Sequence, residues 1–174
     1  MPDLLTLDAN PIVDLIEDRP GAPEVREILD LGLAGEVDLA VSRVITDDLL
    51  ERTDYGDALR ALRVLDVDLV GRPFRLDGSP LGGDDRLGSA AFLALPAELA
   101  VSVEWAVERR NLGRLPGAVD FDHLHAHYLH RRDFFITRDK PILRWTRAAM
   151  EPRFGVRAVC PETYLARRSG ADRA

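Results

Sequence analysis

The sequence is poor in the residues that staple small proteins, and it has no stretch suited to a membrane. Its 174 residues include one cysteine, Cys160, so an intramolecular disulfide and a thiolate-rich zinc site are excluded. No apolar run reaches the roughly 18 residues that a membrane-spanning helix needs. The first residues carry no basic region followed by an apolar run, so we expect no signal peptide and a cytoplasmic location. Aromatic residues make up 6%, so the core is expected to consist mainly of aliphatic side chains.

Negative charge is in excess, but it is unevenly distributed. The formal net charge of −7 argues against a protein that coats nucleic acid along its whole surface. Residues 131–174 hold 11 Lys or Arg against 5 Asp or Glu, whereas residues 1–130 hold 12 against 25. Guanidinium groups match phosphate with a bidentate fork, so this basic last quarter could bind a phosphate backbone. An ordinary solvated surface is the alternative.

Short apolar runs alternate with amphipathic segments, which favours one α/β domain over residues 1–174 with a parallel sheet of about four to five strands. The predicted strands are 4–7, 37–41, 67–70, 134–136 and 156–159. The predicted helices are 11 to near 18, 23–33, 44–52, 55–65, 89–95, 97–111, 120–132, 140–150 and a short one that begins at Pro161. Residues 71–88 are rich in Gly, Pro and Asp and are expected to form a surface loop.

Aspartates lie at the predicted strand ends and helix starts. They are Asp8 after the first strand, Asp47 and Asp48 on the helix after the second, Asp120 and Asp122 before the fourth, and Asp139 after the fourth. The carboxyl ends of parallel strands share one edge of the sheet, so several of these carboxylates are expected to converge. A divalent cation relieves their repulsion, and oxygen ligands suit Mg²⁺ or Mn²⁺. For any single aspartate taken alone, a helix cap or a solvated charge is the favoured interpretation.

Five segments resemble, in this order, the PIN-domain nuclease family, including its toxin-type (VapC-like) ribonucleases. They are Leu5-Thr6-Leu7-Asp8-Ala9-Asn10, residues 41–50, Asp122-His123-Leu124-His125-Ala126, residues 133–143 with Thr137-Arg138-Asp139, and residues 156–165 with Pro161-Glu162. The resemblance spans the chain except residues about 71–118, a longer helical or loop insertion than in the compact toxins. It implies a three-layer α/β/α fold in which a central parallel sheet is flanked by helices.

The resemblance also implies an acidic pocket that cleaves RNA with Mg²⁺ or Mn²⁺. Its catalytic residues are Asp8, Asp48, Asp122 and Asp139, its metal ligands are Asp8, Asp122 and Asp139, and its supporting residues are Asn10, Thr137 and Asp47. The second acidic position is usually Glu in the family. Here Asp48 is one methylene shorter, so either the site shifts or Asp47 shares the role.

Basic residues beside the fourth acidic position are the candidates for contact with the RNA backbone, namely Arg138, Lys140 and Arg144. RNA is the expected substrate, and the toxin role would add an antitoxin protein and a homodimer as partners. A catalytically weak PIN module that binds RNA or protein is the alternative function. A phosphatase with an Asp nucleophile is a third reading, but it needs a second Asp where Asn10 stands.

All four histidines lie in one predicted helix. His123, His127 and His130 share a face through their i,i+4 and i,i+3 spacing. We expect this face to point to solvent, with a weak metal or RNA contact as the alternative. His125 stands at the family's D-x-L-H position, where burial is expected.

Overall fold

Five short strands form one all-parallel sheet. The computed structural model describes residues 1–42, 45, 49, 53–54, 56–57, 68–70 and 118–170. The strands are β1 (Asp3–Leu7), β2 (Val37–Ser42), β3 (Asp68–Val70), β4 (Phe134–Ile136) and β5 (Ala158–Val159). Their order is β3-β2-β1-β4-β5, and every neighbouring pair is parallel. The prediction of an α/β chain with a parallel sheet is therefore confirmed.

The described helices agree closely with the predicted ones. They are α1 (Ala9–Ile16), α2 (Ala22–Leu33), α7 (Ala118–Leu129), α8 (Lys140–Trp145), the π-helical turn η1 (Thr146–Met150), α9 (Glu151–Phe154) and α10 (Pro161–Ser169). The side chains of Asp8 and Asp139 cap α1 and α8, and Gly155 ends α9 with a φ of 70° that glycine adopts without strain. The predicted helices 44–52, 55–65, 89–95 and 97–111 and the loop 71–88 lie outside, or almost wholly outside, the described residues.

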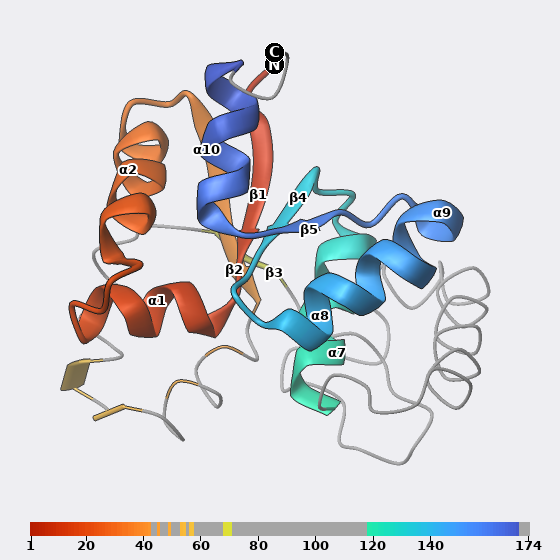
Figure 1. The fold of residues 1–174 in the computed structure, drawn as a ribbon, viewed down its shortest axis with the longest axis horizontal. Helices are drawn as coiled ribbons and strands as arrows, with labels where there is room; N and C mark the ends of the chain where they lie inside the picture. Colours follow the sequence, from red (N-terminus) through yellow and green to blue (C-terminus); the bar gives the residue numbers. More distant parts are fainter. Residues whose placement is uncertain are drawn as a thin grey trace, which may run out of the picture.

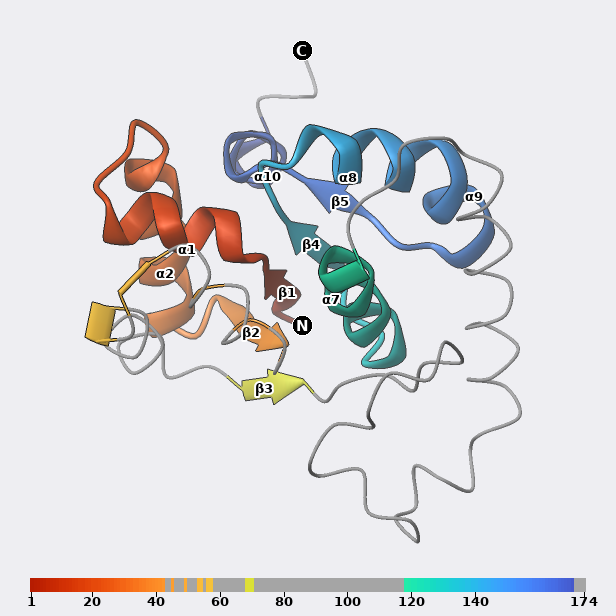
Figure 2. The same ribbon diagram turned by 90° about the horizontal axis from the view of Figure 1, so that it is seen from below.

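Side-chain alternation along the strands separates two packed faces. Figures 1 and 2 show the helices around the sheet. Leu5 and Leu7 of β1 belong to a core that includes residues of α1, α2 and α10, such as Ile28 and Tyr164. On the opposite face, Phe135 of β4 packs in a second core with Leu124 of α7 and with residues of α8 and η1. Figure 2 shows α1 and α2 on one side of the sheet and α7 on the other.

The chain winds outward from the centre of the sheet in both directions. From β1 it passes through α1 and α2 to β2 on one side, and from β4 it passes through α8, η1 and α9 to β5 on the other. The two central strands, β1 and β4, are therefore the place where the direction of winding reverses. In open parallel sheets, ligands bind outside the carboxyl ends of the strands at this topological switch point. Here those ends are followed by Asp8 and by Thr137.

The amino end of β4 is fixed by a buried arginine. Arg132 donates from Nη2 to the carbonyl oxygens of Leu5 (3.0 Å) and Asp38 (2.7 Å), and its side chain is 9% exposed. It also pairs with the Asp38 carboxylate. These bonds tie β4 to β1 and β2 at the end of the sheet that lies away from the switch point.

Candidate functional site

Asp8 is the centre of the switch point. It follows β1 directly, its residue is fully buried, and its backbone N–H bonds to the carbonyl of Ile136 in β4 at 3.0 Å. Three neutral groups donate to its carboxylate. Ala9 N lies 2.8 Å from Oδ1, and Asn10 Nδ2 and Thr137 Oγ1 lie 3.2 and 2.6 Å from Oδ2. These bonds offset the cost of burying a charge and fix the orientation of the carboxylate.

Thr137 connects Asp8 to Asp139. Its hydroxyl donates to Asp8 and accepts the backbone N–H of Asp139 at 3.0 Å, and the residue is fully buried. Asp139 in turn accepts the N–H of Ile142 at 2.9 Å and so begins α8. Four residues that the sequence singled out, Asp8, Asn10, Thr137 and Asp139, are thus joined at one edge of the sheet.

The other predicted acids are not placed. Asp47 and Asp48 lie outside the described residues. Asp122 belongs to α7, but its side chain is also outside what the structure describes. Within the described side chains, no group of three or more His, Cys, Asp or Glu is arranged to hold a metal ion. Asp8 and Asp139 supply the oxygen donors that Mg²⁺ and Mn²⁺ prefer, so this part of the edge fits such an ion chemically.

The expected outward row of histidines on α7 is wrong for two of its three members. His123 and His127 are fully buried and face the sheet, whereas His130 is exposed. His127 Nδ1 lies 3.0 Å from Thr6 Oγ1 of β1, and His123 Nδ1 is hydrogen-bonded to Ser42 Oγ of β2. His123 and His127 do share a face of the helix, but this face contacts the hydroxyls of Thr6 and Ser42 in the sheet instead of water.

Burial keeps His125 and His127 neutral. It lowers the pKa of His125 to about 4, and burial together with the positive charge of Arg132 lowers the pKa of His127 to about 3. The ring of His127 also lies edge-on to Phe135, with centroids 5.7 Å apart. His125 is buried, as expected. These rings hold α7 against the sheet beside the switch point.

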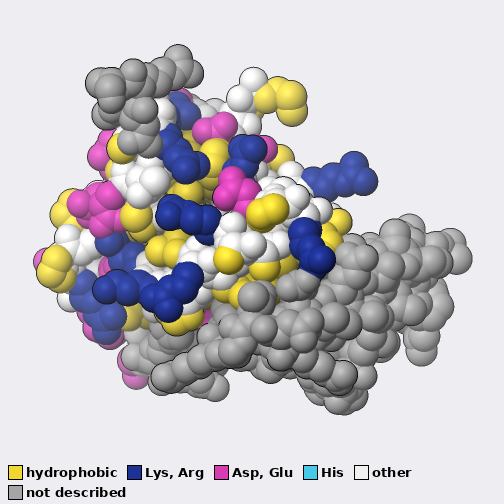
Figure 3. Space-filling model, turned by 45° about the vertical axis from the view of Figure 1, so that its right-hand side comes forward, with side chains coloured by type: hydrophobic (Ala, Val, Ile, Leu, Met, Phe, Trp, Pro, Cys, Tyr) yellow, Lys and Arg dark blue, Asp and Glu magenta, His cyan; other side chains and the backbone are white. Residues whose placement is uncertain are grey.

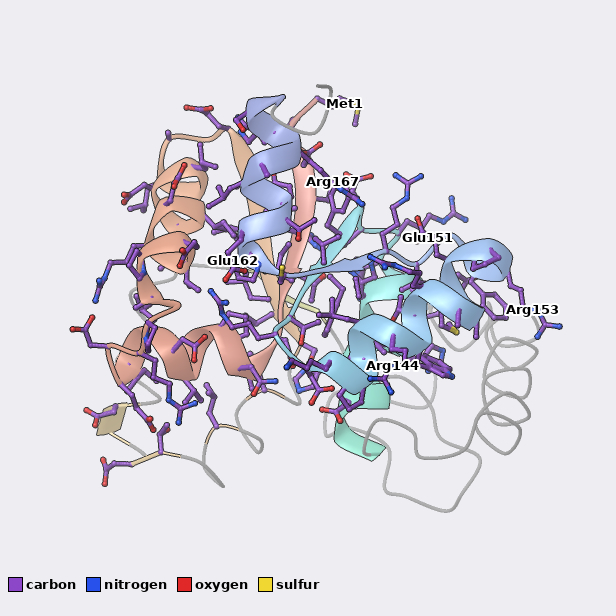
Figure 4. The ribbon with its side chains drawn as sticks, viewed as in Figure 1. Met1, Arg144, Glu151, Arg153, Glu162 and Arg167 are labelled. Atoms are coloured by element: carbon purple, nitrogen blue, oxygen red, sulfur yellow. The ribbon has the colours of Figure 1, made fainter. Side chains whose placement is uncertain are left out.

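Strand alternation separates Arg138 from its neighbours in sequence. Thr137 and Asp139 lie on the α7 and α8 side, whereas Arg138 forms ion pairs with Asp14 and Glu162 of α1 and α10. The other two residues predicted to contact phosphate, Lys140 and Arg144, are exposed. Figure 4 labels Arg144 on α8 and Glu162 at the start of α10.

Sequence reasoning missed the partners of these groups. Asp14 is an acid inside the apolar helix stripe of α1 and is 7% exposed, and Thr6 and Ser42 are hydroxyls inside apolar strands. A polar residue at a position whose neighbours are all apolar is the signal that could have identified them, because a buried polar group needs a partner.

Comparison with known proteins does not add a family. The sequence matches no protein-family model and no curated protein. None of the described helices combines the length and the hydropathy that would let it cross a bilayer.

Proposed function

We propose that the chain is a metal-dependent endoribonuclease with a PIN-like three-layer α/β/α fold. The observation that carries this proposal is the buried Asp8 carboxylate at the switch point, hydrogen-bonded by Thr137 and linked through it to Asp139. Burying an oriented carboxylate is costly for stability, and such a cost is typical of functional sites. The order of the five sequence segments supports the same family.

The proposed site holds Mg²⁺ or Mn²⁺ between carboxylates that follow neighbouring strands. Asp8, Asp122 and Asp139 are its proposed ligands, Asp48 completes the acidic set, and Asn10, Thr137 and Asp47 support it. When bound, the ion would supply an activated water and stabilise charge on a phosphoryl group. Thr137 and Asn10 hold the Asp8 carboxylate in a fixed orientation by donating to the same oxygen, Oδ2.

The proposed RNA contacts lie on the helix that begins at Asp139. Lys140 and Arg144 are exposed and lie four residues apart, one turn along α8, and exposed Arg147 follows in η1. Figure 3 shows several Lys and Arg side chains over the described part of the face it presents. Backbone contacts of this kind position the nucleic acid without reading its sequence.

Cleavage of total RNA tests the proposal. The purified protein is incubated with Mn²⁺, with Mg²⁺ and with EDTA, beside Asp8→Asn, Asp122→Asn and the control Asp30→Asn. Asp30 is exposed on α2, so its variant keeps the folded chain and loses one carboxylate elsewhere.

Cleavage that requires metal, disappears in Asp8→Asn and Asp122→Asn and persists in Asp30→Asn is the expected result. Absence of cleavage by the wild type with either ion contradicts the nuclease and favours the module that binds RNA or protein. Growth arrest on expression, relieved by a small partner protein, would add the toxin role.

A further inference from the structure

The guanidinium of Arg138 is held by four oxygen-bearing groups, two of which accept hydrogen bonds and two of which form ion pairs. Its Nε lies 2.8 Å from Asp14 Oδ2, and its Nη1 donates to the Glu162 carboxylate. Its Nη2 lies 3.1 Å from the carbonyl oxygen of Gly21 and 3.6 Å from Glu24 Oε2. Nη1 and Nη2 therefore donate hydrogen bonds, whereas Nε contributes an ion pair with Asp14 that lacks hydrogen-bond geometry, and the side chain is 26% exposed.

These groups come from three separate helices and one connection. Asp14 belongs to α1, Glu24 to α2 and Glu162 to α10, and Gly21 precedes α2. All of these elements pack on the face of the sheet opposite α7. Arg138 therefore ties the end of β4 to the whole layer of helices on that face, and it does so at the switch point.

The site is shaped for a flat guanidinium. A Cβ added at Gly21 would lie 2.4 Å from the Arg138 Cζ, so the group rests directly on the backbone at that residue. Burial opposes the charge, but the hydrogen bond and charge of Glu162, with Asp14 and Glu24, raise the pKa of Arg138 above its ordinary value. Lysine offers one compact ammonium and cannot occupy three such positions at once.

We propose that Arg138 is a positioning residue for the acidic edge. By anchoring the backbone between Thr137 and Asp139, it keeps the Thr137 hydroxyl on Asp8 and the Asp139 carboxylate at the start of α8. The importance of this edge as a metal site rests on the proposed function, whereas the anchoring itself does not.

The test compares Arg138→Gln and Arg138→Lys with Arg132→Gln. Arg132 is the matched control, because it is also a largely enclosed arginine that ties β4 to other elements, but at the opposite end of the strand. Three quantities are measured well below the melting temperatures. They are the hydrogen-exchange rates of the backbone amides of residues 137–140 and 142, those of β1 as the reference for global opening, and the affinity for Mn²⁺ alone.

We expect Arg138→Gln to raise exchange at 137–140 and 142 by about tenfold relative to β1, a local opening rather than a global one. We expect it to weaken Mn²⁺ binding by about tenfold or more, the usual cost of losing a group that orients metal ligands. Arg132→Gln should lower the melting temperature but leave the exchange ratio and the Mn²⁺ affinity near their wild-type values. Arg138→Lys should resemble Arg138→Gln.

Several results overturn the proposal. Equal exchange ratios in Arg138→Gln and Arg132→Gln would reduce Arg138 to a general stabiliser, and full recovery in Arg138→Lys would show that charge alone suffices. Unchanged Mn²⁺ affinity despite faster exchange would refute the effect on the site. If the wild type binds no Mn²⁺ and cleaves no RNA, the proposed function fails, and the exchange ratios alone decide whether Arg138 anchors the edge.

Discussion

The buried histidines of α7 make the stability of the fold depend on pH above the range in which carboxylates titrate. His125 and His127 are neutral in the folded chain, because burial lowers the pKa of His125 to about 4 and that of His127 to about 3. In the unfolded chain both rings take up protons near their ordinary pKa of about 6.5. Below that pH the unfolded state binds more protons, so stability falls as the pH decreases from about 6.5 towards the folded pKa values.

The size of the effect follows from these values. Between pH 7 and pH 5 each histidine should lower the free energy of unfolding by about 2 kcal/mol, or about 4 kcal/mol for the pair. In a chain of this length the corresponding fall in melting temperature is roughly 10 °C. Urea unfolding at pH 7, 6 and 5, followed by circular dichroism, measures the change as a shift in midpoint at constant slope.

His127→Asn is the diagnostic variant. Its side-chain amide can replace Nδ1 opposite Thr6 but does not titrate, so the loss between pH 7 and pH 5 should drop by about half, to about 2 kcal/mol. His130→Gln is the control, since His130 is exposed and its replacement should leave the pH dependence unchanged. A wild type with the same unfolding free energy at pH 7 and pH 5 would refute the reasoning.

Three further predictions concern single contacts. Thr137→Val should lower the unfolding free energy by roughly 3 kcal/mol, because Asp8 and the N–H of Asp139 both lose a hydrogen-bond partner. Thr137→Ser keeps the hydroxyl and should lower it by about 1 kcal/mol. Equal urea midpoints for the two variants would contradict this. Gly155→Ala should cost about 1 kcal/mol through its φ of 70° alone, since nothing lies within 4 Å of an added Cβ, and a neutral result in thermal unfolding would reject backbone strain. Replacing Lys140 and Arg144 together by Gln should weaken the salt dependence of single-stranded RNA binding, so that the slope of log Kobs against log salt concentration changes by about 1.4. Fluorescence anisotropy measures this binding, with Asp8→Asn as the parent protein so that the RNA is not cleaved. An unchanged slope would disprove the contact.

The sheet and the acidic edge could be predicted from sequence because their signals are local. Apolar runs gave all five strands, with the bounds of Phe134–Ile136 unchanged, and polar residues directly after them placed Asp8, Thr137 and Asp139 at one edge. Strand order could not be predicted in this way, because the reversal between β1 and β4 depends on contacts between distant segments.

The directions of side chains were harder to predict. Arg138 adjoins Asp139 in sequence, but adjacent residues of an extended segment point to opposite faces. Its guanidinium therefore pairs with carboxylates of α1 and α10 on the other side of the sheet. Exposure of the face that carries His123, His127 and His130 is the expectation for an amphipathic helix, with His125 expected to be buried. Residues 123–127 are in fact all buried, a full turn, so this described part of the helix presents no exposed polar face for the periodicity to reveal.

The separation in sequence of the two central strands has a consequence for biosynthesis. Asp8 and the Thr137 hydroxyl that holds it are 129 residues apart, although they follow neighbouring strands. At about 5–20 residues per second a ribosome needs roughly 10 s to pass from one to the other. During that interval β1 has no β4 beside it, and the long loop must close before the edge can form. If this edge cleaves RNA, a nascent chain carries no complete cleavage site until the residues around Thr137 have also emerged from the ribosome.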